Sequence, residues 1–387
     1  MPVQKITIEE FLKLAKQYPV LDVRSPGEYK HAHIPTAHSL PLFTDEERKQ
    51  VGTAYKQQSR EAAIKIGLDY FGVKMRKMVE EVEGICNLEF GKKEGAGTIP
   101  QFPTPNSQPL LVHCWRGGMR SAAVAWLLDL YGFKVYLLVG GYQAYRKWVR
   151  SQFEKDYNFN IIGGYTGSGK TLLIHQLIKE NKTIIDLEAL ANHKGSAFGS
   201  IENIPQPGQE MFENYLAQAL AQSAVTSGQL AKDAEPLLPV ANCQQPTANC
   251  IFIEDESQRI GNLQIPMPLW YTMRKAPIFF IDIPFEKRLE YITEEYGKQK
   301  KEFLKEAILR IQKRLGGLET KNAINFLEEN NYTACFRILL TYYDKWYHKG
   351  LYNRENINGL LNKIPCTVVD TQVNTQKLLS CNIVSAT

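Results

Sequence analysis

Twice in this chain an apolar segment of strand character runs through a glycine-containing loop directly into an apolar helical segment. The first case covers residues 110–121 with the helical run 122–130, and the second covers a strand at 158–162, a loop at 164–171 and a helix at 172–179. Strands that alternate with helices predict a parallel α/β sheet. Because 387 residues can form two or three sizeable cores, we expect an α/β chain of at least two domains.

The first loop carries a cysteine between the apolar strand and the helix. Loops at helix N-termini turn their backbone N–H groups toward anions, and the helix dipole and nearby arginines favour a thiolate. The pattern therefore predicts that Cys114 is a nucleophile. A buried structural cysteine is the weaker alternative. The expected anion-binding residues of this loop are Arg116, Gly117, Gly118, Arg120 and Ser121.

The second loop fits the phosphate-binding pattern G-x-x-x-x-G-K-[ST], between the strand and the helix that the pattern requires. Its glycines let backbone N–H groups close around phosphate oxygens, while a lysine supplies positive charge and a threonine can ligate Mg²⁺. We therefore expect this half of the chain to bind a phosphorylated compound. The expected binding residues are Gly164, Gly167, Ser168, Gly169, Lys170 and Thr171.

Composition restricts the setting in which the protein works. No apolar run approaches the roughly 18 residues that cross a bilayer, and residues 1–10 lack the pattern of a signal peptide. The seven cysteines are scattered without a C-x-x-C pair, which argues against a disulfide framework or a zinc ribbon. These features predict a cytoplasmic protein with no membrane partner. The net charge of +5 permits a nucleic-acid partner without demonstrating one.

The expected first domain covers residues 1–153. It should contain a helix at 8–17 that opens with a capping box from Thr7 to Glu10, a strand at 20–23, a mostly helical stretch at 45–83, and a loop at 91–109. A strand at 134–139 and a helix at 142–153 should complete it.

The expected second domain covers residues 158–387. Further strands are predicted at 183–185, 250–253, 277–281 and 367–369, with a helix at 209–225 and long loops at 193–198 and 226–249. A helical region at about 285–349 should form the C-terminal part.

Basic and aromatic residues interleave in this helical region, a composition that suits a phosphate backbone with splayed bases. Glutamates such as Glu302 and Glu306 dilute the positive charge, so a solvated helix face with ordinary ion pairs is an equal alternative. The candidate RNA-binding residues are Lys298, Lys300, Lys301, Lys305, Arg310, Lys313 and Arg314, with Tyr342, Tyr343, Trp346 and Tyr347 nearby.

Acidic residues follow two of the predicted strands of the second domain. Asp186 follows the strand at 183–185, and Asp255 lies within the acidic trio 254–256 after the strand at 250–253. Phosphate-loop domains place acids that orient metal ions at such strand ends. For Asp186, capping of the following helix is an equal alternative.

Several motifs together resemble known families. The segments 21–29 (LDVRSPGEY) and 33–35 (HIP), with the cysteine loop, resemble a rhodanese domain, although two turn glycines of that family's Gly-His-Ile-Pro-Gly-Ala motif are Ala32 and Thr36 here. The further segments resemble the tRNA 2-selenouridine synthase family across nearly the whole chain. They are PLFTDEER (41–48), VGTAY (51–55), GGYQAYR (140–146), DLE (186–188), HKGSAFG (193–199), EDES (254–257) and RIG (259–261).

The resemblance implies a fold and a reaction. The fold is an N-terminal rhodanese-like domain followed by a P-loop NTPase-like parallel-sheet domain with a helical C-terminal part. The substrate is a tRNA with 2-thiouridine at the wobble position, which is S-geranylated from geranyl diphosphate and then receives selenium from selenophosphate. On this resemblance Cys114 handles selenium, residues 116–121 receive selenophosphate, and the phosphate loop holds a diphosphate. No tightly bound cofactor is implied, and Mg²⁺ is possible.

Three alternatives stay open at this point. His113–Ser121 also satisfies the His-Cys-x5-Arg-Ser pattern of cysteine phosphatases, whose loop holds a tetrahedral oxyanion against a thiolate. The chain could instead be a tRNA-binding module without catalysis, or a kinase that uses ATP at the phosphate loop. Phosphate release from an aryl phosphate would favour the cysteine phosphatase. Binding of tRNA with no change of nucleoside mass would favour the non-catalytic module. ATP turnover that depends on Lys170 would favour the kinase.

Overall fold

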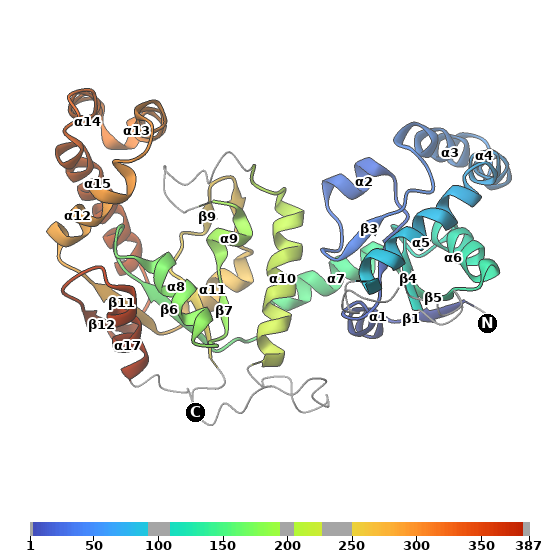
Figure 1. The fold of residues 1–387 in the computed structure, drawn as a ribbon, viewed down its shortest axis with the longest axis horizontal. Helices are drawn as coiled ribbons and strands as arrows, with labels where there is room; N and C mark the ends of the chain where they lie inside the picture. Colours follow the sequence, from blue (N-terminus) through green and yellow to red (C-terminus); the bar gives the residue numbers. More distant parts are fainter. Residues whose placement is uncertain (1–2, 92–108, 194–204, 227–249, 382–387) are drawn as a thin grey trace. The chain divides into compact units, whose positions relative to one another are not determined.

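The computed structural model of the protein describes residues 3–91, 109–193, 205–226 and 250–381 (Figure 1). The chain divides into two compact units, residues 1–151 and 152–387, close to the division expected between 153 and 158. The loops expected at 91–109, 193–198 and 226–249 fall almost entirely outside the described residues.

The first unit is built on a five-stranded sheet in the order β1-β5-β4-β2-β3, in which every pair of neighbours is parallel. Its strands are β1 (Gln4–Ile6), β2 (Val20–Asp22), β3 (Ala37–Ser39), β4 (Pro109–His113) and β5 (Lys134–Leu138). Its helices are α1 (Ile8–Leu14), α2 (Pro26–His31), α3 (Asp45–Gln57), α4 (Arg60–Gly72), α5 (Met75–Gly91), α6 (Met119–Tyr131) and α7 (Gly141–Phe153), whose last residues reach the second unit.

Local signals explain much of this unit. Thr7 and Glu10 form the expected capping box of α1, although that helix ends at Leu14 rather than at residue 17. The stretch 45–83 is helical, as expected, in three consecutive helices. Helices α5 and α6 share one buried apolar core with β2, β4 and β5, which fixes the position of the loop between β4 and α6.

The second unit is built on another five-stranded parallel sheet, in the order β12-β11-β6-β8-β7. Its strands are β6 (Phe159–Gly163), β7 (Ile184–Ile185), β8 (Ile251–Glu254), β11 (Ile278–Asp282) and β12 (Leu361–Pro365), and β9 (Arg259–Ile260) pairs with β10 (Leu263–Gln264). Its helices are α8 (Lys170–Lys179), α9 (Leu187–Ala191), α10 (Gln209–Thr226), α11 (Met267–Lys275), α12 (Phe285–Tyr296), α13 (Lys301–Leu315), α14 (Gly317–Glu328), α15 (Tyr332–Tyr352), α16 (Ile357–Leu360) and α17 (Thr371–Ser380).

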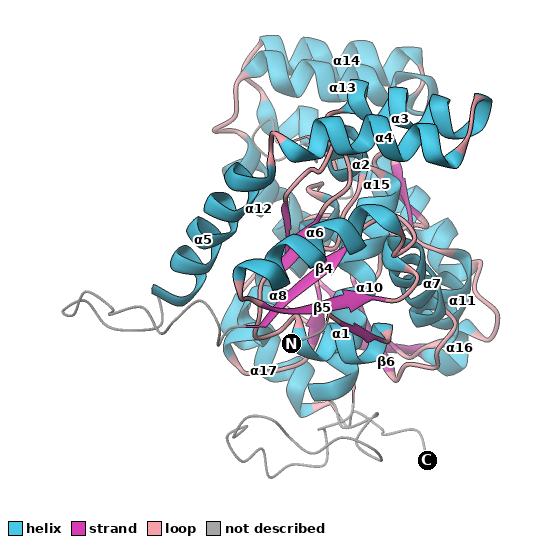
Figure 2. Cartoon of the chain, turned by 90° about the vertical axis from the view of Figure 1, so that its right-hand side faces the viewer, coloured by secondary structure: helices cyan, strands magenta, loops and turns pink. Residues whose placement is uncertain are grey.

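Two apolar cores stabilise the second unit. One joins the sheet to α8 and α17, through residues such as Ile162, Ile174 and Leu378. The other joins α12, α13, α14 and α15, through residues such as Leu289 and Phe336. The helical C-terminal part expected at about 285–349 is therefore present, with a core of its own, and Figure 2 draws its helices in cyan.

The strand expected at 367–369 is wrong. The last strand is β12, Leu361–Pro365, which pairs in parallel with β11 at the edge of the sheet. Its Asn362, Lys363 and Pro365 have weak strand propensity, whereas Thr367, Val368 and Val369 have the β-branched side chains that strands favour. Pairing with β11 decides the outcome over local propensity, and an edge position tolerates the proline.

Within the described residues, no helix is long and apolar enough to cross a membrane.

Candidate functional site

The predicted nucleophile lies where the central part of the first sheet ends. Strand β4 pairs with β2 and β5 and delivers Cys114 to the loop that precedes α6. The side chain is 3% exposed, and the Ser121 hydroxyl donates a hydrogen bond to its Sγ at 3.1 Å. The same hydroxyl lies 3.1 Å from the Gly118 carbonyl oxygen, so Ser121 contacts both the sulfur and the backbone of the loop.

The turn after β5 packs directly against the cysteine loop. The N–H of Tyr142 donates to the Cys114 carbonyl at 2.8 Å, and the N–H of Gln143 donates to the Trp115 carbonyl at 3.0 Å. Gly141 has φ +56°, and a Cβ there would lie 2.3 Å from the Cys114 carbonyl oxygen. Only glycine fits this position, so the Gly-Gly-Tyr segment sets the backbone of the loop.

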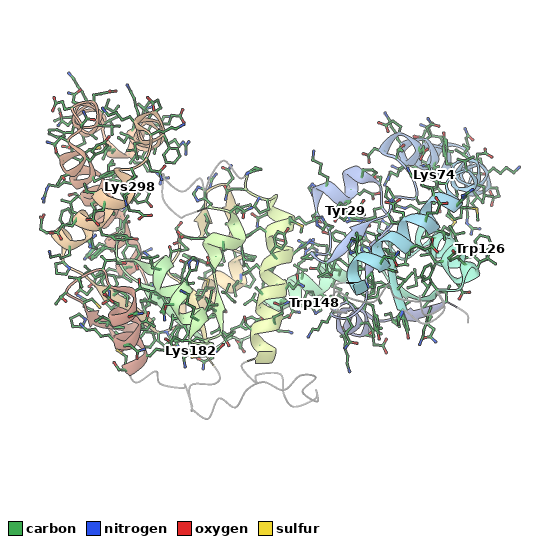
Figure 3. All side chains as sticks on the ribbon, in the orientation of Figure 1. Tyr29, Lys74, Trp126, Trp148, Lys182 and Lys298 are labelled. Atoms are coloured by element: carbon green, nitrogen blue, oxygen red, sulfur yellow. The ribbon has the colours of Figure 1, made fainter. Side chains whose placement is uncertain are left out.

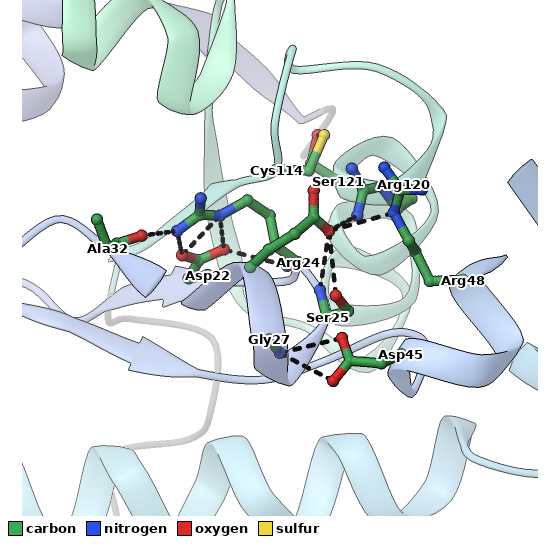
Figure 4. Close-up of polar contacts among 11 residues, drawn as sticks. Asp22, Arg24, Ser25, Gly27, Ala32, Asp45, Arg48, Cys114, Arg120 and Ser121 are labelled. Atoms are coloured by element: carbon green, nitrogen blue, oxygen red, sulfur yellow. Dashed lines mark hydrogen bonds and ion pairs between the residues drawn. The ribbon is translucent and has the colours of Figure 1, made fainter. Parts of the chain in front are cut away.

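An ion pair holds Arg120, one of the residues expected to bind an anion (Figure 4). Its Nη1 donates to Glu28 Oε2 at 2.7 Å, and the same carboxylate accepts from the N–H of Ser25 at 3.2 Å. Burial alone would raise the pKa of Glu28, but Arg120, the Ser25 N–H and the charge of Arg48 together lower it. Of the loop's two arginines, Arg116 is exposed and Arg120 is fixed by Glu28.

A second buried group links the motif at 22–24 to the same loop. Arg24 binds both carboxylate oxygens of Asp22 and lies 3.9 Å from the centre of the Tyr142 ring. Its guanidinium also donates to the Ala32 carbonyl at 2.7 Å. His113, next to the cysteine, is fully buried, and burial lowers its pKa, so the ring is neutral. These residues form a rigid support beneath the loop.

In the second unit the phosphate loop leaves the end of β6 and enters α8 as expected. Gly167 and Gly169 have φ of +81° and +75°. Lys170 Nζ donates to the Gly164 carbonyl at 2.9 Å, back across the loop. The buried Ser168 hydroxyl has no hydrogen-bond partner within the described part of the chain. Such a hydroxyl costs on the order of 1–3 kcal/mol, which a bound phosphate oxygen would relieve.

A residue of α15 completes this loop. The N–H of Gly164 donates to Tyr347 Oη at 3.1 Å, and the Tyr347 hydroxyl donates to Asp255 Oδ2 at 2.6 Å. The other oxygen of Asp255 forms a buried ion pair with Arg354. Asp255, expected to act as an acid or to orient a metal, therefore anchors Tyr347 and Arg354 beside the loop.

Arg288 braces the loop from α12. It donates to the Thr166 carbonyl at 3.0 Å and binds both carboxylate oxygens of Asp344, at 2.9 and 2.7 Å. The side chain is 3% exposed. No local sequence signal marks the role of Arg288 or that of Tyr347.

The acids at the ends of β7 and β8 have separate environments. Asp186 caps α9 by accepting from the N–H of Ala189 at 2.8 Å, the alternative left open for it. Glu188 accepts from the Thr171 hydroxyl at 3.1 Å. Burial and the charge of Glu188 raise the pKa of Glu254, and they raise the pKa of Glu256 to about 8. Over the described residues no cluster of three or more His, Cys, Asp or Glu side chains is arranged to hold a metal ion. Mg²⁺ binding stays a prediction.

The phosphate loop opens into a cavity of about 1130 Å³. Its wall combines charged groups of the loop and of the strand ends with aromatic side chains from α11, α12 and α15. The aromatic residues are Trp270, Tyr271, Tyr291, Tyr296, Tyr342, Tyr343, Trp346 and Tyr347. A phosphate cradle thus adjoins an extensive aromatic surface.

The basic residues predicted to bind RNA lie on and before α13. Lys298, labelled in Figure 3, lies between α12 and α13 and is exposed. Lys305 pairs with Glu328 at 2.7 Å, and Arg310 approaches Glu306 at 3.6 Å. Lys301 donates to the Glu328 carbonyl at 3.1 Å. Lys300 and Lys313 are exposed, and Arg314 lines the cavity.

The fold and the two loops define an α/β enzyme that joins a cysteine-loop domain to a phosphate-loop domain. Residues 7–147 match the model of the rhodanese-like domain, and residues 157–362 match the model described as the tRNA 2-selenouridine synthase AAA domain. The chain belongs to the tRNA 2-selenouridine synthase family and is an enzyme of tRNA modification. The expected fold class is confirmed.

Relatives named tRNA 2-selenouridine synthase align with most of the chain. The protein of Nitrosomonas europaea is 36% identical over 72% of this chain and 63% of its own length. That of Hydrogenovibrio crunogenus is 32% identical over 86% of this chain and 89% of its own. That of Bdellovibrio bacteriovorus is 30% identical over 92% of this chain and 94% of its own length.

Proposed function

We propose that this chain converts wobble 2-thiouridine in tRNA to 2-selenouridine in two steps, S-geranylation from geranyl diphosphate followed by selenium transfer from selenophosphate. The family of the chain supports the overall conversion. The phosphate-loop site supports the first step, and the cysteine loop supports the second.

The observation that carries the proposal is the junction of a phosphate cradle with an aromatic cavity. Lys170 and the unpartnered Ser168 hydroxyl line the cavity, and so do eight aromatic side chains together with charged groups of both signs. Geranyl diphosphate has the same two-part character, a highly charged diphosphate head on an apolar chain. The charged part of the wall suits the diphosphate, and the aromatic part suits the geranyl chain.

In the first step the thiocarbonyl sulfur of the base attacks C1 of the geranyl chain. The C–S bond forms as the C–O bond to diphosphate breaks, and diphosphate leaves with the electron pair. Backbone N–H groups of residues 164–171 and the Lys170 ammonium neutralise the charge that develops on the leaving group. The product is an S-alkylated base, whose sulfur is a better leaving group than the sulfur of the parent.

In the second step the Cys114 thiolate adds to C2 of the base, and geranylthiolate leaves with the C–S electron pair. The selenium of selenophosphate then displaces the Cys114 sulfur from C2 and regenerates the thiolate. Water cleaves the P–Se bond and releases phosphate, so the atoms balance without an oxidant. The cysteine loop, at the N-terminus of α6, is the anion site of the first unit. We assign the selenium step to Cys114 and its loop.

Nucleoside mass spectrometry tests the proposal. A 2-thiouridine tRNA is incubated with the protein and geranyl diphosphate, with or without selenophosphate. The expected products are S-geranyl-2-thiouridine without selenophosphate and 2-selenouridine with it. An unchanged nucleoside in both reactions would contradict the proposal, and phosphate release from an aryl phosphate would then favour the cysteine phosphatase alternative.

A further inference from the structure

Two large aromatic side chains are exposed at the wall of the phosphate-loop cavity. Tyr271, on α11, is 58% exposed, and Trp346, on α15, is 44% exposed, and both line the cavity. Burying an aromatic side chain stabilises a fold by roughly 1.5–3 kcal/mol. Aromatic rings left in water beside a ligand site are therefore available to a partner that supplies another flat apolar surface.

Cations accompany these rings. Arg274 lies 5.6 Å from the centre of the Trp270 ring and Lys349 lies 5.4 Å from that of Trp346. Lys275 and Arg314 also line the cavity, as do the acidic Glu295 and Glu355. Exposed aromatic faces with interspersed cations are typical of sites for unpaired nucleotides, whose bases stack on rings while phosphates approach the cations.

The size of the cavity leaves room for a second ligand. Pockets that hold one drug-sized molecule measure about 300–1,000 Å³, and this cavity measures about 1130 Å³. If the site transfers a group from a diphosphate to a base, the reacting atoms must come within roughly 3–3.5 Å of each other. The base must then enter the cavity that holds the diphosphate.

Resting on the proposed function, we infer that Tyr271 and Trp346 form the stacking platform for the target uridine and an adjacent unpaired base of the tRNA. Arg274, Lys275 and Arg314 approach the flanking phosphates. This assignment moves the RNA-binding centre from α13 to the cavity wall. On α13, Lys305 and Arg310 already face the carboxylates of Glu328 and Glu306.

The test is direct binding of an anticodon stem-loop RNA that carries 2-thiouridine, measured by fluorescence titration with no donor present. Trp346→Ala and Tyr271→Ala are expected to weaken RNA binding roughly 5- to 100-fold each, the range for loss of one base–aromatic stack. Trp346→Phe should restore most of the affinity. Tyr352→Ala is the matched control, because Tyr352 is 43% exposed on the same helix but stacks on His348 and does not line the cavity.

Geranyl diphosphate affinity is measured on the same variants. It should fall by less than RNA affinity does in each variant, because the phosphate loop and the other aromatic residues of the cavity remain to hold the donor. RNA affinity unchanged in both alanine variants would overturn the inference. So would a loss of geranyl diphosphate affinity with RNA affinity retained, which would assign the two rings to the geranyl chain.

The binding measurement separates this inference from the chemistry. If the alanine variants lose RNA affinity while the parent protein leaves the nucleoside mass unchanged, the platform stands and the two-step reaction fails. In Arg274→Gln the slope of log RNA affinity against log salt concentration should fall in magnitude by about one. This result would further support a contact between Arg274 and an RNA phosphate.

Discussion

The two anion loops of this molecule have the same strand–loop–helix arrangement. They differ in whether their polar side chains already have partners within the chain. Each follows a strand inside a parallel sheet and precedes a helix, and each has positive φ at glycine, at Gly117 in the first loop and at Gly164, Gly167 and Gly169 in the second. In the first unit Ser121 already donates to Cys114, and Arg120 is already paired with Glu28. In the second unit the Ser168 hydroxyl has no partner in the described structure, and the loop opens into a large cavity.

The carboxylates near the two loops show the same difference. Arg120 lowers the pKa of Glu28, whereas burial and the charge of Glu188 raise the pKa of Glu256 to about 8. In the cysteine loop Arg120 is thus paired with Glu28, whereas Arg116 is exposed. The phosphate-loop site holds crowded acids and an unused hydroxyl, an arrangement that a ligand would complete. We attribute the small-anion chemistry to the first loop and the larger ligand to the second.

The largest expected effect comes from removing the cysteine. Cys114→Ala should abolish selenium incorporation, by at least about a thousandfold, because the reacting group of the first loop is lost. Geranylation should stay within about twofold of the parent protein. Nucleoside mass spectrometry measures both, with Cys86→Ala, on α5, as the matched control. If Cys114→Ala lost geranylation and selenium incorporation equally, the claim that the two loops perform separate steps would be contradicted.

Removing the charge of the phosphate loop should have the next largest effect. Lys170→Ala should weaken geranyl diphosphate binding roughly 10- to 100-fold, since a hydrogen bond to a charged group contributes about 1.5–3 kcal/mol. Calorimetric titration checks this. Lys179→Ala, at the other end of α8, is the control and should bind as the parent protein does. Unchanged geranyl diphosphate affinity in Lys170→Ala would show that the diphosphate does not bind at this loop.

The crowded acids predict a stability that falls as pH rises. Because the folded pKa of Glu256 is raised to about 8 from an ordinary 4.5, ionisation opposes folding between those pH values. Glu256→Gln should therefore be more stable than the parent protein at pH 8, by on the order of 2 kcal/mol, and equally stable below pH 5. Denaturant unfolding across this range measures the difference. Glu46→Gln, on exposed surface of the first unit, controls for loss of one carboxylate.

Glu28 should show the opposite sign and a smaller effect. Its folded pKa is lowered, so its stabilisation is present above the ordinary value of 4.5 and is lost as pH falls through the folded pKa. Glu28→Gln should lose about 1 kcal/mol at pH 7 and nothing in acid. Glu80→Gln removes an exposed i,i+4 pair with Arg76 and is the control, which should change stability less than Glu28→Gln does at pH 7. If Glu28→Gln lost the same free energy of unfolding at pH 7 and in acid, the ion pair between Glu28 and Arg120 would not be the source of the loss.

Local motifs explain which parts of the site could be read from sequence. The cysteine loop and the phosphate loop each occupy one continuous segment between a strand and a helix, so spacing and residue type were enough. The contacts that complete them join distant residues. Glu28 meets Arg120 across 92 positions, and Gly164 meets Tyr347 across 183.

Contacts of that range have no periodicity and no fixed spacing, so propensity cannot find them. The same limit explains β12, where pairing with β11 decides the strand although residues 367–369 have the stronger propensity. It also explains Asp255, whose acidic neighbours suggested a metal-orienting role before Arg354 and Tyr347 were seen to engage both its oxygens.

The central claim, that the two loops perform separate steps, is tested most directly by passing the tRNA between two variants. 2-Thiouridine tRNA is first treated with Cys114→Ala and geranyl diphosphate, purified, and then given to Lys170→Ala with selenophosphate. Nucleoside mass spectrometry should find S-geranyl-2-thiouridine after the first reaction and 2-selenouridine after the second. Persistence of the geranylated nucleoside in the second reaction, under conditions where the parent protein converts it, would contradict the account.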